Sequence, residues 1–585
     1  RPRSDGARAA SDWLLENLLA SGGWSKWQGQ PEFDLDTSVL ALLGLRLCGA
    51  DAEDPRLQSA RDAILNAGGA GSCQGLARYY LAVFGQLDWG CCPPLVPEMD
   101  WIPKWIRTSP ANRSEWTRLL LAPLSILWSR RPRKIVREEY GVADLFDTEI
   151  RDCQTSLLER FLVGLNDLRF RPLRKIVLGN IDQWMVDRIT RRDGMAGSFD
   201  ATLVSIVGLT SQGYSRDSGP LADAIGCVRE RIAKLANSKD AEGAAIQQSP
   251  VCDTAMSVRA LAPLARESDE LAVRRGIEWL LERAAQAESA EQGGWCREFE
   301  NREYPGILST SIVLLALREQ FAERPPSSLV TDDSMVAMIR ANSINLAHRQ
   351  VAVLDRVAAA SRRARQWVTS RQNYDGGWGH LQHLNASTNN ACSKIFGNHC
   401  AADISTPAAT GRVLQSLGAW EMGCGQHVVD RAVSFLRGLQ LDDGSWAAFH
   451  DAGSIESTWS AIEGLRAVGL SRRDSTLADS ARWLMDQQNE DGGWSESFGE
   501  KAVKVLPKLG ASCPSVTAWA ILGLMAAGHR QSDATLRGID FLEQSRMPDG
   551  GWTATTPHRL NVMSGYWRVR SQISALSSSH IGCSP

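Results

Sequence analysis

The sequence predicts an all-α protein built from repeated helical hairpins that close into two rings of paired helices. Three observations support this prediction. A short phrase recurs along the chain, and each copy is followed by an apolar helix rich in Ala and Leu with few β-branched runs. The chain is also long: 585 residues are several times the length of one ordinary domain.

The recurring phrase is an amphipathic helix followed by a Gln, a short acidic turn, a Gly and a Trp. Copies end at Trp378, Trp446, Trp494 and, with Arg546 in the Gln position, at Trp552. Weaker copies end at Trp24 and Trp295, and a decayed copy has Met195 in the Trp position. A phrase that recurs every ~50 to 70 residues indicates one hairpin unit used many times.

The turn residues suggest what the phrase does. Gly permits positive φ, which lets the bulky indole fold back on a neighbouring hairpin, and the Gln can hydrogen-bond exposed backbone ends there. We therefore predict that these Trp residues are structural staples rather than substrate contacts. A linker-like stretch at residues 236–246 is predicted between the two rings, and residues 325–361 form a charged, Ala-rich connection expected to be helical.

Composition narrows the functional class. The chain is 43% hydrophobic and 22% charged, and 64 basic against 67 acidic residues give a formal charge of -3. Nucleic acid is therefore not an expected partner. The 13 Cys residues are scattered apart from Cys91 and Cys92, so we expect reduced thiols and no metal site. No apolar run approaches the ~20 residues that span a bilayer and no secretory signal opens the chain, so a cytoplasmic location is expected. The chain begins at Arg1, which leaves its true amino terminus open.

The number and order of the Gln-to-Trp phrases resemble the repeat of squalene-hopene cyclases and their oxidosqualene and class II terpene cyclase relatives. Local signatures that begin at Asp34, Trp101, Pro123 and Ser249 agree with the same family. The resemblance covers nearly the whole chain. It implies two (α/α) barrels with a large apolar cavity between them. Residues 1–240 would form the second barrel, without part of the family's amino-terminal region, and residues 241–585 the first (α/α)6 barrel, with most of the repeats.

The resemblance also implies a reaction. In these cyclases an Asp of an Asp-x-Asp-Asp-Thr motif protonates an alkene or epoxide of a folded prenyl chain, and aromatic faces stabilise the resulting carbocations. In this chain the motif is replaced by Gly306, Ile307, Leu308 and Ser309. None of these residues can donate a proton to an alkene. The family's partner His corresponds to Arg412 and a nearby family Asp to Ala408, so initiation is expected to be non-standard.

Other cavity positions are altered as well. A cation-stabilising Phe of the family corresponds to Arg297, next to a retained Phe299, and aromatic positions correspond to His450 and Glu456. The substrate-binding set implied by the resemblance is Trp116, Arg297, Phe299, Ser309, Leu381, Tyr566 and Trp567. These replacements make the expected pocket more polar and partly cationic.

Four residues are candidates for catalysis. We predict that Glu456 and Arg412 lie close together as an ion pair or a replacement acid site, with His450 assisting Glu456. The alternative, that both side chains merely bridge helices or face solvent, stays open. Asp253 retains a family Asp at the start of a cavity-facing helix, where it would either cap the helix or take part in catalysis.

The sequence thus predicts a terpenoid cyclase-like enzyme that acts on a polyprenyl or triterpenoid substrate without a cofactor. One alternative is a re-purposed homologue that binds a polar-headed isoprenoid without cyclising it. A zinc enzyme like the protein prenyltransferases, using Cys252, Asp253 and His450, is disfavoured because the expected Asp-x-Cys pair is missing. Weak peripheral membrane attachment is expected from the Trp-rich, basic stretch 101–134, and a homodimer is left open.

Overall fold

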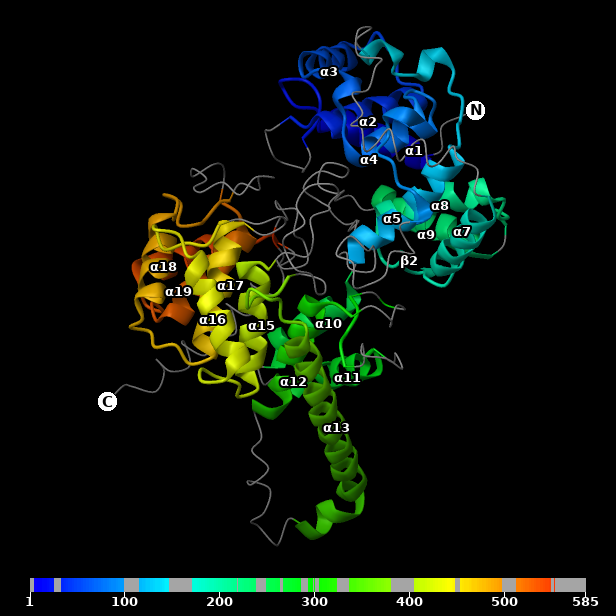
Figure 1. The fold of residues 1–585 in the computed structure, drawn as a ribbon. Helices are drawn as coiled ribbons and strands as arrows, with labels where there is room; N and C mark the ends of the chain where they lie inside the picture. The colour runs from blue at the N-terminus through cyan, green and yellow to red at the C-terminus, as the bar shows by residue number, and fades with distance from the viewer. Residues whose placement is uncertain are drawn as a thin grey trace. The chain divides into compact units, whose positions relative to one another are not determined.

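The computed structural model describes residues 5–25, 33–98, 115–146, 171–217, 219–237, 249–262, 267–285, 293–297, 299, 305–322, 336–379, 405–447, 453–496, 512–548 and 552. These residues form two compact units, one up to residue 237 and the other from residue 249 onward. Both consist of packed helices (Figure 1). Within the described ranges the strands are β1 (Ile189–Thr190) and β2 (Gly194–Met195), a short antiparallel pair. The prediction of an all-α protein is confirmed.

The first unit is held by two groups of buried apolar side chains. Its helices are α1 (Asp5–Glu16), α2 (Leu35–Leu47), α3 (Pro55–Asn66), α4 (Gly75–Val83), α5 (Glu115–Arg130), α7 (Arg171–Val186), α8 (Phe199–Gln212) and α9 (Gly219–Asn237). Short 3₁₀ turns lie at Ala70–Ser72, Trp89–Cys91, Glu138–Tyr140 and Ala143–Leu145. One apolar group joins α1 to α4 around Trp24, and the other joins α4, α5, α7, α8 and α9 around Trp128.

The second unit is a succession of inner and outer helices. Its helices are α10 (Pro250–Leu261), α11 (Glu267–Glu282), α12 (Ile307–Ala322), α13 (Val336–Ser370), α15 (Pro407–Ala419), α16 (His427–Leu439), α17 (Ser454–Ala467), α18 (Ser475–Asp486), α19 (Pro514–Ala527) and α20 (Asp533–Gln544). The inner helices α10, α12, α15, α17 and α19 pack each against the next, and the outer helices α11, α13, α16, α18 and α20 pack against them.

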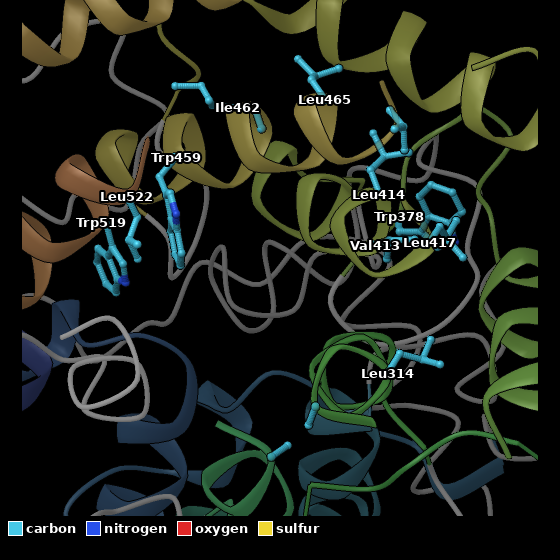
Figure 2. Packing of buried hydrophobic residues seen from close by; sticks show 14 of the residues in the cluster. Leu314, Trp378, Val413, Leu414, Leu417, Trp459, Ile462, Leu465, Trp519 and Leu522 are labelled. Carbon is cyan, nitrogen blue, oxygen red and sulfur yellow. The ribbon is translucent and has the colours of Figure 1, made fainter. Parts of the chain in front are cut away.

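Sequence patterns explain the two layers. The outer helix α16 buries Val429, Ala432, Val433 and Leu436, the i, i+3, i+4, i+7 stripe of a helix with one covered face. The inner helices α17 and α19 are buried nearly all round, as expected for helices covered on every side. Figure 2 shows Trp459 of α17 and Trp519 of α19 side by side in this core.

Each Trp of the repeat joins two helices. The indole N–H donates to a carbonyl near the end of the preceding outer helix: Trp378 to Val368 at 2.9 Å, Trp446 to Leu436 at 2.8 Å and Trp494 to Leu484 at 2.7 Å. The backbone N–H of the same residues donates to a Thr hydroxyl near the start of the next inner helix, at Thr410, Thr458 and Thr517. These indoles are fully buried. Their prediction as staples is confirmed.

The Gln of the phrase joins successive outer helices. The side-chain amide of Gln488 donates at 2.8 Å both to Gly492 in its own turn and to Ala534 in the first turn of α20. Gln372 and Gln440 make the equivalent pairs of bonds. The turn needs Gly because Gly492 has φ of 86° and a Cβ there would overlap the backbone of Arg537.

The oxidation state of the cysteines differs from the prediction at one position, Cys91. The described cysteines that are free are mostly buried, as predicted: Cys48, Cys73, Cys92, Cys227, Cys252, Cys296, Cys424 and Cys513. Cys91 is disulfide-bonded, so the expectation that every thiol is reduced was wrong. Among the described residues, no helix combines the length and apolar character needed to cross a membrane.

Candidate functional site

The first candidate site is a polar cluster where α10 meets α12; we call Ser249, Cys252, Asp253, Arg297 and Ser309 the α10–α12 cluster. Ser249 precedes α10, and its hydroxyl donates to the carbonyl of Arg297 at 3.3 Å. The Cys252 thiol donates to the hydroxyl of the buried Ser309 at 3.5 Å. The structure thus brings together three residues that the sequence had suggested separately, Asp253, Arg297 and Ser309.

Burial sets the protonation of this cluster. The surrounding protein raises the pKa of Asp253 from 3.8 to about 6, and the positive charge of Arg297 opposes the shift. The carboxyl is nevertheless accessible to solvent. Burial also raises the pKa of the Cys252 thiol, against the hydrogen bonds of Ser249 and Ser309. Cys252 is therefore neutral, whereas Asp253 titrates close to neutral pH.

Asp253 does not cap its helix, so that part of the prediction was wrong. The helix begins one turn earlier, with Ser249 at the N-cap and Pro250 in the first helical position. Asp253 donates its backbone N–H to the carbonyl of Ser249 at 2.8 Å and therefore already belongs to the helix. Pro is favoured at the first helical position because its missing N–H has no helical partner there, and this fixes the earlier start.

The turn that replaces the family's acid motif is ordered by backbone bonds. Gly306 donates its N–H to the carbonyl of Trp295 at 3.0 Å, and Thr310 donates to the carbonyl of Gly306 at 3.0 Å. Residues 306–309 therefore lie at the start of α12, and their sequence supplies no carboxyl group there. The nearest acid that the cluster itself contains is Asp253 on α10.

The second candidate site lies between α15 and α17. The guanidinium of Arg412 stacks on the Trp459 indole, with its central carbon 3.8 Å from the ring centroid. Arg412 also donates to the side-chain oxygen of Gln415 at 3.3 Å, and Gln415 donates to the buried Glu463. Trp459 in turn stacks on Trp519, with centroids 5.9 Å apart. Arg412 is thus held against one face of the Trp459 indole by stacking and by its hydrogen bond to Gln415.

Glu456 lies in the first turn of α17 and is half-buried. Glu456 stands three residues, about one helical turn, before Trp459, on whose ring Arg412 stacks. The proximity of Glu456 and Arg412 stays a prediction, and so does their ion pair.

A second carboxyl, which the sequence analysis missed, lies on the same turn. Glu496 accepts the backbone N–H of Ile455 at 2.5 Å through its Oε1 atom. Burial raises the pKa of Glu496 from 4.5 to about 8; the N–H of Ile455 opposes the shift and the negative charge of Glu456 adds to it. Glu496 therefore keeps its proton at neutral pH.

Phe299 is placed beside other aromatic and cationic groups. Its ring lies 5.7 Å from that of Trp279, and the Arg283 guanidinium lies 4.4 Å from the Phe299 ring centroid. Arg283 also donates to the Phe299 carbonyl at 2.9 Å. The backbone of Trp116 belongs to α5, and its side chain is outside the described part. His450, Leu381, Tyr566 and Trp567 also lie outside the described residues.

Metal binding finds no support in the described part of the chain. No three His, Cys, Asp or Glu side chains there lie close enough together to hold an ion. Cys252 and Asp253 are adjacent in α10, while His450, the third residue of the alternative zinc site, is outside the described ranges.

A positional rule within the repeat could have revealed Glu496. Arg297 and Glu496 both stand two residues after a repeat Trp, at Trp295 and Trp494. Each contacts or acts on the first turn of the preceding inner helix, α10 or α17. Trp459 could not have been found in this way, because its role depends on helices brought together by the fold.

Comparison with known proteins finds two matching domain models and relatives that align over most of the chain. The model of the squalene-hopene cyclase N-terminal domain matches residues 2–237, and that of the C-terminal domain matches residues 248–331 and 327–559. A probable squalene–hopene cyclase of Sinorhizobium fredii is 27% identical over 92% of this chain and 83% of its own length. A squalene–hopene cyclase of Zymomonas mobilis is 26% identical over 91% of this chain and 80% of its own. Among solved structures, ent-copalyl diphosphate synthase from Streptomyces platensis aligns over 97% of this chain and 94% of its own, with 12% identity and a TM-score of 0.46.

Proposed function

Because this chain belongs to the squalene-hopene cyclase family, we propose that it is a terpenoid cyclase that starts its reaction without the family's Asp motif. The substrate is a polyprenyl or triterpenoid chain. The observation that carries the proposal is the match of both cyclase domain models along nearly the whole chain. The non-standard start rests on residues 306–309, where the sequence has no carboxyl group.

The two candidate sites supply an acid and a base. Glu456 is the proposed donor: its carboxyl O–H bond breaks, the proton adds to a terminal alkene carbon, and the alkene electrons form the new C–H bond. Ring closure carries the positive charge along the chain. Asp253, with a pKa of about 6, is largely ionised at neutral pH and takes up the proton lost when the last cation becomes an alkene. The proton count balances over the cycle.

The remaining predicted residues bind and shape the substrate. Trp116, Phe299, Tyr566 and Trp567 would steady cationic carbon through their ring faces, and Leu381 would add apolar lining. Arg297, Ser309 and Arg412 would orient a polar end of the substrate, with His450 assisting Glu456. No organic cofactor or metal enters this scheme.

The test is product formation in heavy water. Purified protein is incubated in D₂O with squalene, oxidosqualene or geranylgeranyl diphosphate, and products are analysed by mass spectrometry. We expect a cyclised product with one deuterium at the carbon first protonated, and a loss of turnover of about 10²–10⁴-fold in Glu456→Gln. Glu490→Gln is the matched control, because Glu490 is exposed in the turn that precedes Trp494. Folded protein that cyclises none of these substrates would overturn the proposal.

One observation favours the alternative of a binder that does not cyclise. The Arg412 guanidinium already covers a face of Trp459, so that face is not open to a substrate carbocation. A guanidinium suits carboxylate or diphosphate oxygens instead. An isoprenoid that copurifies unchanged with the protein, without cyclised product, is the outcome this alternative expects; stoichiometric zinc in the purified protein would favour the prenyltransferase-like alternative instead.

Peripheral membrane attachment is proposed for a cytoplasmic protein of this kind. Ile135 is 90% exposed and stands among Arg133, Lys134 and Arg137. Both arginines are ion-paired with neighbouring carboxylates, so the exposed Ile135 and Lys134 are the proposed contacts with anionic lipid. Vesicle binding tests it.

A further inference from the structure

The repeat places one residue against the start of each of two inner helices. Two residues after Trp295, the carbonyl of Arg297 accepts from the Ser249 hydroxyl at the start of α10, and the charge of Arg297 acts on Asp253. Two residues after Trp494, the corresponding contact at the start of α17 is made by Glu496. The first position pairs opposite charges, Arg297 and Asp253. The second brings together two acidic side chains, Glu496 and Glu456.

The carboxyl group of Glu496 is positioned by the residues at the start of α17. Gly453 precedes α17 and offers no capping side chain, and a Cβ there would overlap the carboxyl of Glu496. The carboxyl instead lies over the helix end and accepts the Ile455 N–H. Its second oxygen, Oε2, is buried and has no hydrogen-bond partner among the described residues. A buried carboxylate with an unpaired oxygen is costly, whereas the protonated form removes the charge.

Within the described ranges, few other charges act on this turn. Burial and the adjacent charge of Glu456 hold the Glu496 proton, while two backbone N–H groups oppose them. From α15, Arg412 stacks on Trp459, one turn after Glu456. Helix α19 carries no ionisable side chain. The ionisable residues of α18 are Asp479, Arg482 and Asp486, of which the first two form an ion pair at 3.0 Å.

We propose that Glu496 and Glu456 form a coupled carboxyl pair that stores the initiating proton, with Glu456 delivering it to the substrate and Glu496 acting as the positioning residue that reloads Glu456. The inference rests on the proposed function and names the group that replaces the missing Asp cluster. At rest Glu496 holds the proton and Glu456 is a carboxylate; the proton passes from Glu496 to Glu456, Glu456 gives it to the alkene, and solvent returns one proton to Glu496. The proton that Asp253 takes up returns to solvent, so none is consumed.

The coupling is tested first without substrate. The infrared carbonyl band of a protonated carboxyl is followed against pH in the full-length protein and its variants. We expect a band present at pH 7 that disappears as the pH rises through about 8. The band should be absent in Glu496→Gln and unchanged in Glu490→Gln. In Glu456→Gln it should disappear at lower pH, since the like charge that holds the proton is gone. A helix cap without coupling would titrate identically with and without Glu456, and that result would overturn the pair.

The catalytic part is tested by turnover. Glu496→Gln keeps an acceptor for the Ile455 N–H, so the fold is retained, but it holds no transferable proton. We expect kcat to fall at least about tenfold with KM unchanged, while Glu490→Gln keeps wild-type kinetics. Wild-type kcat in Glu496→Gln would overturn the reloading role while leaving the proposed function intact. No turnover by the wild type would overturn the proposed function and the catalytic role together, whereas the infrared titration still decides whether the pair exists.

Discussion

At the scale of single residues, the same backbone position carries opposite electrostatics in two copies of the repeat. Arg297 opposes the rise in the pKa of Asp253, which reaches about 6, whereas Glu456 adds to the rise in the pKa of Glu496, which reaches about 8. The sequence predicted Asp253 and Glu456 as candidate residues because the resemblance marked their positions. The position of Glu496 two residues after Trp494 marked it in the sequence, but its burial could not be predicted, because the burial depends on Gly453 and α17, which the fold brings against it.

Glu496 makes folding stability depend on pH. Its pKa is about 8 in the folded chain and near 4.5 when unfolded, so between these values only the folded state binds the proton. The unfolding free energy therefore falls as pH rises through this window, by at most ~1.4 kcal/mol per pH unit from this group. Glu496→Gln should flatten that part of the curve, measured by urea unfolding at pH 5, 6, 7 and 8. A variant as pH-dependent as the wild type would contradict the raised pKa.

At the scale of helices, each copy of the recurring phrase makes three hydrogen bonds that join it to neighbouring helices. The Trp fixes the preceding outer helix, the Gln reaches the next one, and a Thr at the start of the inner helix receives the Trp backbone N–H. The sequence predicted the roles of Trp and Gln from residue type and spacing. The Thr contribution was not predicted, because Thr517 and its counterparts stand at different distances from their Trp along the chain.

Removing one Gln should weaken the second unit measurably. In Gln488→Ala the carbonyls of Gly492 and Ala534 and the side chain of Arg537 lose their partner. Since groups left unpaired in the interior cost ~1–3 kcal/mol, we expect a loss of that size in the unfolding free energy. The control is Gln544→Ala, because Gln544 is exposed near the end of α20. Equal stability of the two variants in chemical denaturation would argue against the Gln as a link between outer helices.

At the scale of the whole molecule, each unit has its own core. Among the described residues, one apolar group belongs to the second unit and two belong to the first. The period of the repeat predicted the helical hairpins, because each copy of the phrase encodes the same local helix and turn. Which polar residues meet, such as Ser309 with Cys252, was not predictable from spacing, because α10 and α12 are separated by an outer helix in the chain.

Membrane attachment involves the whole molecule, but a single substitution can test it. A formal charge of -3 gives the protein no general attraction to anionic lipid, so we propose a local contact at Ile135, next to the end of the stretch 101–134. We expect sedimentation with vesicles that contain phosphatidylserine, weakened by raised salt because the basic side chains are screened. Ile135→Asp should reduce binding severalfold. Ile176→Asp is the control, since Ile176 is also exposed, at 54%, but lies on α7. Vesicle binding of Ile135→Asp equal to that of the wild type would contradict the contact at Ile135.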